Sequence, residues 1–202
     1  MDKSFDKAQD KPLRYSSIAI SGRPGAGRST LLKNLRTYLK PLDWEFFSGG
    51  DWARKYAIES GSHKADDPTH HKATDYGDDI DKQIDITMRE KLADKNNHVA
   101  VESWIAGWNM RGLPHVLKVL LMCDDALRID RIVNRENITV EDAKNHIRER
   151  EETNTTKWKR MYGQDDFWDP KYYDMVINTY SHGPQETLDL VLQALGFYKN
   201  NK

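Results

Sequence analysis

The stretch that decides the fold runs from Ile18 to Thr30 and reads Ile-Ala-Ile-Ser-Gly-Arg-Pro-Gly-Ala-Gly-Arg-Ser-Thr. It begins as an apolar strand, turns through three glycines and opens directly into the helix-like segment Leu31–Lys40. The spacing fits the pattern G-x-x-x-x-G-K-[ST], with Arg28 where lysine is expected. The glycines let backbone N–H groups approach an anion, and the N-terminus of the following helix attracts negative charge. The pattern therefore predicts a loop that binds a polyphosphate. The alternative is a glycine-rich surface turn.

Each position of this loop has an expected role at a nucleotide. Ser29 offers a hydroxyl for Mg²⁺, and Arg28 offers a permanent positive charge. The residues expected to surround the phosphates of the nucleotide are Gly22, Pro24, Gly25, Ala26, Gly27, Arg28, Ser29 and Thr30.

The composition limits the class of protein. A chain of 202 residues is long enough for one domain with a sizeable core. Its net charge of −1 lacks the basic excess of a nucleic-acid-binding protein, so no nucleic-acid partner is expected. The single cysteine, Cys123, excludes an internal disulfide and fits a cytoplasmic protein in a reducing environment. We expect the protein to be a monomer. We expect Cys123 to be a small buried side chain rather than a nucleophile. No apolar run approaches the roughly 20 residues that span a membrane, and no signal peptide is expected.

Apolar runs alternate with amphipathic stretches along the chain. Residues 1–14 are expected to form a disordered arm outside the fold, and residues 15–200 a single domain. The predicted strands are Tyr15–Ser21, Trp44–Ser48, His98–Val101, Val116–Met122 and Asp174–Asn178. The predicted helices are Ser29–Lys40, Asp51–Ser60, Asp78–Asp94, Asp124–Asn134, Val140–Met161 (capped by Thr139) and Gln185–Leu195. This alternation predicts a three-layer α/β/α fold with a five-stranded parallel sheet, and Gly61–Tyr76 is predicted to be a mobile loop.

Ligands of an open α/β sheet bind beyond the carboxyl ends of its strands. The first four strands end at the glycine loop, Ser48–Asp51, Glu102 and Asp124, so these segments should meet at one cleft. Glu102 is either an ordinary strand-end acid or a carboxylate that holds Mg²⁺ through water. Asp81 and Asp85 share a helix face, where they contact either an acceptor base or ribose, or only solvent.

Three further groups of side chains could carry chemistry. Arg128, Arg131 and Arg135 lie on one helix face, where they form either a clamp on phosphoryl oxygens or a salt-bridged solvent face. The pair His70-His71 lacks a spaced third ligand, so we favour exposed loop residues over a metal site. Trp104 and Trp108 flank Gly107, where packing is favoured over stacking on a base.

The order of motifs from Ile18 to Thr179 resembles the archaeal-type cytidylate kinases, a branch of the nucleoside monophosphate kinases. The segments that carry the resemblance are Ile20–Gly27, Ser48–Arg54, Asp81–Asp85, Glu102–Trp108, Arg131–Glu136, Arg150–Glu152, Tyr162–Asp165 and Tyr173–Thr179. That family often has threonine at the position of Arg28, so the missing lysine is not unusual in it.

The resemblance implies a phosphate-loop kinase fold with a helical acceptor-binding region at about 48–95 and a helical lid at about 131–165. It implies transfer of the γ-phosphoryl group of Mg-ATP to a nucleoside monophosphate, with CMP or dCMP expected. Arg131 would lie against the donor adenine and phosphates, and Glu102 would join Ser29 at the metal through water. The expected catalytic residues are Arg28, Arg131, Arg135 and Arg150. The expected acceptor-binding residues are Ser48, Gly50, Asp51, Arg54, Asp81 and Trp104, with Arg54 holding the acceptor phosphate.

The chain departs from the family pattern at three places. Ser103-Trp104 stands where the family usually has glycine-arginine, Lys157 replaces a lid arginine, and Trp52-Ala53 changes the acceptor segment. Two alternatives therefore stay open. One is a kinase for another nucleotide or a small hydroxylated metabolite, and the other is an ATP-binding module that has lost transfer.

Overall fold

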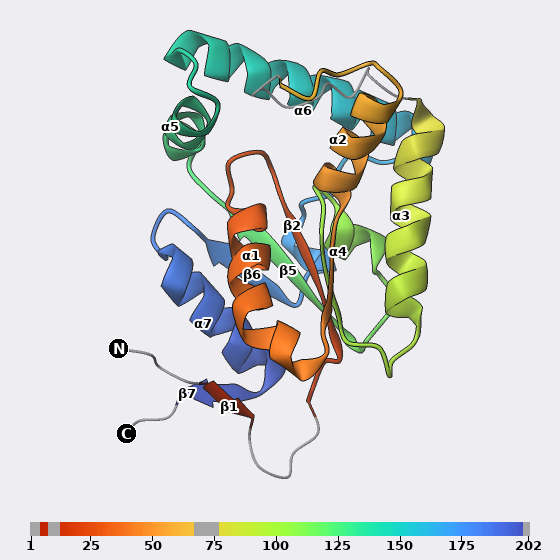
Figure 1. Cartoon of the computed structure of the whole chain (residues 1–202), viewed down its shortest axis with the longest axis vertical. Helices are drawn as coiled ribbons and strands as arrows, with labels where there is room; N and C mark the ends of the chain where they lie inside the picture. Colours follow the sequence, from red (N-terminus) through yellow and green to blue (C-terminus); the bar gives the residue numbers. More distant parts are fainter. Residues whose placement is uncertain (1–4, 8–12, 67–76, 200–202) are drawn as a thin grey trace.

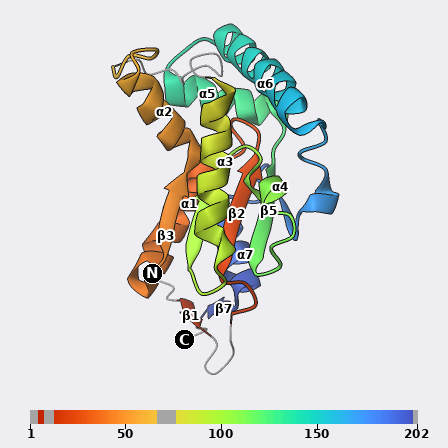
Figure 2. The same ribbon diagram turned by 90° about the vertical axis from the view of Figure 1, so that its right-hand side faces the viewer.

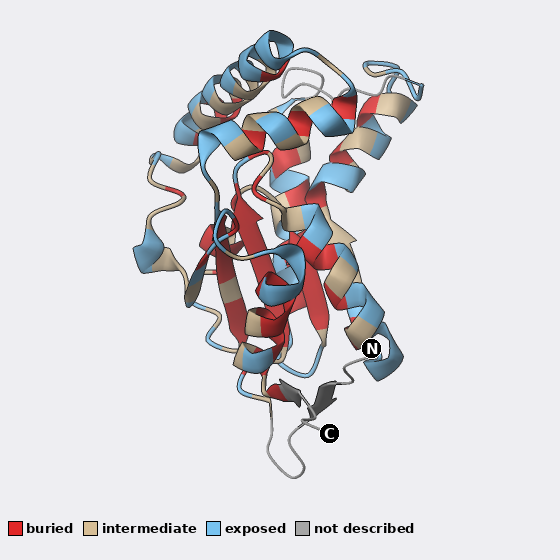
Figure 3. Ribbon diagram, turned by 90° about the vertical axis from the view of Figure 1, so that its left-hand side faces the viewer, coloured by how far each residue is buried: buried red, intermediate tan, exposed pale blue. Residues whose placement is uncertain are grey.

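A sheet of five parallel strands forms the centre of the molecule, in the order β3-β4-β2-β5-β6. The computed structural model describes residues 5–7, 13–66 and 77–199. The strands are β2 (Ser17–Gly22), β3 (Glu45–Ser48), β4 (Val99–Glu102), β5 (Val116–Met122) and β6 (Met175–Asn178). Every residue of β2 and β4 is buried, as expected for parallel strands that are covered on both faces (Figure 3).

Helices cover the two faces of this sheet. Because side chains alternate along a strand, Ile18 and Ile20 of β2 face one layer and Ala19 faces the other. Ile18 and Ile20 pack in a cluster with leucines of α1 (Arg28–Leu39) and α7 (Pro184–Leu195). Ala19 packs in a second cluster with the apolar side of α3 (Asp78–Ala93) and with Ala106 of the short helix α4 (Ala106–Asn109). The result is the predicted three-layer arrangement.

Three helices lie beyond the carboxyl ends of the strands. They are α2 (Gly49–Glu59), α5 (Asp125–Glu136) and α6 (Val140–Tyr162), which Figures 1 and 2 show across the top of the molecule. The hydroxyl of Thr139 accepts from the backbone N–H of Asp142 at 3.1 Å, which confirms the predicted start of α6. The segment where the lid is expected thus consists of the end of α5, all of α6 and three residues beyond it.

The five predicted strands and six predicted helices are all present, with ends shifted by at most two residues. The prediction that residues 1–14 lie outside the fold is wrong for β1 (Phe5–Lys7), which pairs antiparallel with β7 (Phe197–Lys199). Four short elements were not predicted, because they are too short for periodicity to reveal: β7, α4 and the two 3₁₀ turns at Lys40–Leu42 and Pro170–Tyr172. Within the described ranges, no helix is both long and apolar enough to cross a bilayer. His70, His71 and most of the predicted loop lie outside the described residues.

Candidate functional site

A cavity of about 630 Å³ lies between the carboxyl ends of the strands and the helices above them. This volume is in the range of small-ligand sites. The first three strand ends meet here, as the sequence predicted: the glycine loop after β2, Ser48 at the end of β3, and Glu102 at the end of β4. Asp124 is not among the lining residues; its side chain instead caps α5 by accepting from the backbone N–H of Ala126.

The glycine loop forms one end of the cavity, where Pro24, Gly25, Gly27, Arg28, Ser29 and Thr30 line the wall. Gly25 has a φ of +77°, and a Cβ added there would lie 2.8 Å from the backbone oxygen of Arg128. Gly27 precedes α1 with a φ of +100°, and no side chain caps that helix. The first turn of α1 therefore leaves backbone N–H groups for an anion. Gly22 and Ala26 are buried below the lining surface.

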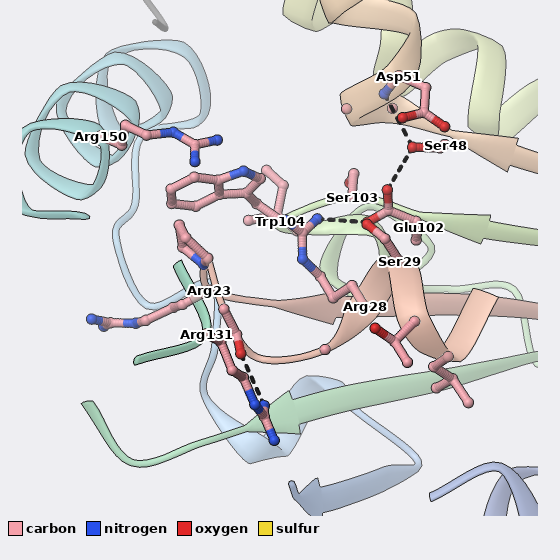
Figure 4. Close-up of a pocket in the computed structure, with 18 of the residues that line it drawn as sticks. Arg23, Arg28, Ser29, Ser48, Asp51, Glu102, Ser103, Trp104, Arg131 and Arg150 are labelled. Carbon is pink, nitrogen blue, oxygen red and sulfur yellow. Dashed lines mark hydrogen bonds and ion pairs between the residues drawn. The ribbon is translucent and has the colours of Figure 1, made fainter. Parts of the chain in front are cut away.

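Two arginines of α5 donate hydrogen bonds to carbonyl oxygens of the loop. The guanidinium of Arg131 donates to the carbonyl oxygen of Gly25 at 2.9 Å, and to the hydroxyl and carbonyl oxygens of Thr179, each at 3.0 Å. Nε of Arg128 donates to the carbonyl oxygen of Pro24 at 2.7 Å. Arg131 lines the cavity, but these contacts indicate that it also fixes the shape of the loop (Figure 4).

Arg128 and the loop are also joined to α6. Glu151 of α6 accepts from Arg128 and from Nη1 of Arg23, the latter at 2.9 Å. Arg128 is buried, so it acts as a structural tie and not as the phosphoryl clamp considered from its spacing. The pairing of Glu151 with an arginine of this cluster follows from the sequence, whereas its contact with Arg23 does not, because nothing in the local pattern pairs residues 128 positions apart.

A chain of polar contacts crosses the floor of the cavity. Nη1 of Arg28 donates to Oε2 of Glu102 at 2.8 Å, and the hydroxyl of Ser48 donates to Oε1 of Glu102 at 2.6 Å. Oγ of Ser48 in turn accepts from the backbone N–H of Asp51 at 3.1 Å, so Ser48 caps α2 (Figure 4). Burial lowers the pKa of the Arg28 guanidinium, and the charge of Glu102 opposes that shift. Arg28 and Glu102 therefore neutralise one another at the junction of the loop and β4.

Trp104 follows this ion pair and lies between two arginines. The Cζ atoms of Arg28 and Arg150 are 5.9 and 5.3 Å from the centroid of its ring, and Figure 4 shows the indole between the two groups. Both distances are within the range of cation–π attraction. Trp104 also meets the ring of Trp158 on α6 edge-on, with centroids 5.6 Å apart. The packing interpretation is confirmed, and Trp104 additionally orders two cationic groups that line the cavity.

The opposite end of the cavity is formed by α2 and α3. Gly50, Asp51 and Ala53 line it from α2, and Asp81, Ile84 and Asp85 line it from α3. Lys157 of α6 forms an ion pair with Asp81 at 2.5 Å, and burial raises the pKa of this aspartate while Lys157 opposes the rise. Burial raises the pKa of Asp85 to about 7, although the hydroxyl of Tyr162 donates to its carboxyl group.

Of the remaining predicted site residues, some line the cavity and one does not. Arg135 and Arg150 line the cavity from α5 and α6, and Arg135 also pairs with Glu136 at 2.5 Å. Arg54, the residue expected to hold the acceptor phosphate, is not among the lining residues. Lining residues that the sequence analysis did not select include Asn134, Asn154 and His182, which come from three separate segments.

The site offers few protein ligands to a magnesium ion. Among the described residues no three acidic, histidine or cysteine side chains cluster as a metal site, and both oxygens of Glu102 already accept hydrogen bonds. The hydroxyl of Ser29 lines the cavity beside the open helix N-terminus. This donor set fits Mg²⁺ held mainly by phosphate oxygens and water, as is usual for this ion at nucleotides.

Comparison with known proteins agrees with this geometry. Residues 17–181 match the model of the cytidylate kinase-like family. This chain belongs to the cytidylate kinase-like family. The cytidylate kinase of Haloarcula marismortui is 36% identical over 90% of both chains, and that of Halobacterium salinarum is 32% identical over 90% of both.

The fold is also found among solved kinases. A gluconokinase from Sinorhizobium meliloti aligns over 92% of this chain and 93% of its own, with a TM-score of 0.54 and 14% identity. That likeness concerns the fold alone. Together with the family match, it identifies the chain as a phosphotransferase of the phosphate-loop kinase type.

Proposed function

We propose that this protein transfers the γ-phosphoryl group of Mg-ATP to the phosphate of a nucleoside monophosphate, with CMP or dCMP as the acceptor. The observation that carries the proposal is a cavity with two chemically different ends. The glycine loop at one end suits a polyphosphate, and the other end combines apolar walls with carboxyl groups. Arg28, Arg135 and Arg150 line the space between them, where charge moves during phosphoryl transfer.

At the donor end, backbone N–H groups of the loop bind the β- and γ-phosphates. Ser29 holds Mg²⁺, which neutralises phosphate charge when it is bound, while Glu102 acts through Arg28 and surrounding water. Arg131 keeps the loop in shape through Gly25 and, from the cavity wall, also contacts the donor. Since an acceptor phosphate oxygen is already anionic at neutral pH, no general base is required.

At the acceptor end, Ser48, Gly50 and Asp51 face the nucleoside, and Asp81 and Asp85 face its base or ribose. Trp104 stands where the family usually has arginine, and it keeps Arg150 over the cavity. In the described conformation Arg54 lies outside the lining, so its role on the acceptor phosphate requires that α2 moves toward the cavity when the acceptor binds. Closure of α6 over both substrates excludes water and prevents simple hydrolysis of ATP.

A coupled assay tests the proposal. ADP release is measured with ATP alone and with CMP, dCMP, UMP, AMP and GMP, for wild type and for Arg54→Ala. We expect CMP and dCMP to raise turnover well above ATP alone, and Arg54→Ala to raise the acceptor KM far more than the ATP KM. A neighbouring charge that does not line the cavity, Lys55, provides the matched variant Lys55→Ala, which should leave both KM values unchanged.

The same assay separates the alternatives. Turnover with another nucleotide or a hydroxylated metabolite but not with CMP would reassign the acceptor. This outcome needs a test because Trp104 stands where the family usually has arginine. ATP binding by calorimetry without product from any acceptor would identify a nucleotide-binding module that has lost transfer.

A further inference from the structure

Two acidic side chains of α3 line the acceptor end of the cavity one helical turn apart, but their partners differ. Asp81 is paired with the ammonium group of Lys157 at 2.5 Å. Asp85 receives a hydrogen bond from the neutral hydroxyl of Tyr162, and Asn109 of α4 is its other polar neighbour. Among the described residues no cation forms an ion pair with Asp85.

The nearest arginine on the same helix is directed elsewhere. Arg89, one turn beyond Asp85, donates to the carbonyl oxygens of Asn109 at 2.6 Å and Arg111 at 3.4 Å. Asp85 therefore faces the cavity beside a second acid, Asp81, with no positive charge of its own.

The surroundings of Asp85 favour its neutral form. The ring of Tyr162 packs against Trp108 with centroids 5.1 Å apart and against Phe167 at 6.3 Å, so an aromatic cluster lies behind the carboxyl group. An apolar environment and a nearby like charge both disfavour a carboxylate. In agreement with this geometry, burial and the charge of Asp81 outweigh the hydrogen bond from Tyr162, and the pKa of Asp85 is raised to about 7.

We propose that Asp85 binds the acceptor base as a neutral carboxylic acid, donating its O–H to a ring nitrogen and accepting from the adjacent amino group. This inference rests on the proposed function and specifies how the base is recognised. N3 and the 4-amino group of cytosine present that acceptor and donor side by side. A protonated carboxyl group offers the complementary donor and acceptor, whereas a carboxylate only accepts.

The proposal makes acceptor binding dependent on one proton. An ionised Asp85 would still accept from the amino group but would face the lone pair of N3, and the bidentate pair would be lost. Acceptor affinity should therefore fall as the pH rises above the pKa of Asp85, approaching tenfold per pH unit for a single linked proton.

The test is a calorimetric titration of CMP into the full-length protein between pH 7.0 and 9.0. The second pKa of a phosphate monoester is about 6, so the charge of the CMP phosphate is nearly constant over this range. For wild type we expect the CMP Kd to rise with pH toward the tenfold limit. Asp85→Asn keeps one donor and one acceptor but cannot ionise, so its Kd should stay close to the wild-type value at pH 7.0 and change little with pH.

Two more variants control the measurement. Asp79→Asn makes the same chemical change at an exposed position of α3 outside the cavity and should retain the wild-type slope. Tyr162→Phe removes a hydrogen bond that favours the ionised form, so it should move the onset of weakening to higher pH.

A flat Kd for wild type, or an unchanged slope in Asp85→Asn, would overturn the inference. An equal slope for ribose 5-phosphate would also overturn it, because Asp85 would then bind the sugar or phosphate instead of the base. CMP-dependent turnover with a flat Kd would leave the proposed function standing without this inference. Absence of CMP binding and turnover at every pH would overturn both.

Discussion

Arg28 and Glu102 form an ion pair of 2.8 Å that joins the first turn of α1 to the end of β4. The loop pattern predicts a cation at position 28 that reaches the donor phosphates, yet in the structure this cation is held by a buried carboxylate. Glu102 also accepts from Ser48, so one carboxyl group connects the phosphate loop with the start of α2. Glu102 therefore positions groups from both ends of the cavity.

Removing Arg28 alone should lower the stability of the protein more than neutralising both members of the pair together. We expect Arg28→Ala to lower the free energy of unfolding by about 3 kcal/mol, because Glu102 would remain buried without its cation. The double variant Arg28→Ala/Glu102→Gln should recover part of this loss but not the ATP turnover. Urea unfolding and the coupled assay measure the two effects separately.

The free energies of unfolding of the two single variants and the double variant show whether Arg28 and Glu102 interact. If the effects of Arg28→Ala and Glu102→Gln on stability simply add, the two side chains do not interact in solution.

Trp104 should matter for turnover more than for substrate affinity. Trp104→Ala removes the ring between Arg28 and Arg150, so both guanidinium groups gain freedom where the phosphoryl group moves. We expect kcat to fall about tenfold or more with smaller changes in either KM, because misplaced charges weaken catalysis steeply. Trp104→Phe keeps an aromatic face and should retain most of the activity.

Tyr172→Ala is the matched control for that prediction. Tyr172 packs in the same aromatic cluster but does not line the cavity, so its loss should lower the melting temperature without a comparable fall in kcat. Equal losses of kcat in the two variants would mean that Trp104 acts only through packing.

The sequence predicted the sheet and the loop because their signals are local. Strand–helix alternation and the glycine spacing act over fewer than about 20 residues, and each predicted element is present. Side-chain partners that lie far apart in the chain have no such signal. Neither the pair of Arg28 with Glu102 nor that of Lys157 with Asp81 follows from spacing. The first depends on how α1 lies against the end of β4, and the second on how α6 meets α3.

The same reason explains two features of the structure that the sequence did not predict. Arg128 and Arg131 share a helix face with Arg135, as predicted, but the loop packs on that face and takes up the donors of the first two as structural contacts. The strand β1 has three residues and is stabilised by pairing with β7 at the other end of the described chain, so no periodicity in residues 1–14 announces it.

Gly25 and Gly27 should respond differently to the same substitution. Both have a positive φ, but a Cβ at Gly25 would lie 2.8 Å from the backbone oxygen of Arg128, while one at Gly27 would meet only Nη1 of Arg131 at 3.8 Å. We expect Gly25→Ala to displace the loop from α5 and abolish ATP binding, and Gly27→Ala to be less damaging to stability. Thermal unfolding with and without ATP compares them, and a similar loss of stability in both would show that backbone strain alone is responsible.

Ionisation of Asp85 should make the folded state less stable as the pH rises. Its pKa is about 7 in the folded protein, above the usual 3.8 of an aspartate, so the folded state binds the proton more tightly than the unfolded chain does. The favourable contribution is complete below pH 3.8 and is lost as the pH rises through 7. Asp85→Asn removes this dependence, so the variant should gain in melting temperature relative to wild type between pH 5 and pH 8. Carboxyl groups that do not interact with position 85 titrate equally in both proteins, which makes the difference between the two curves the relevant measurement. A difference that is constant over this range would show that Asp85 is ionised throughout, with an ordinary pKa.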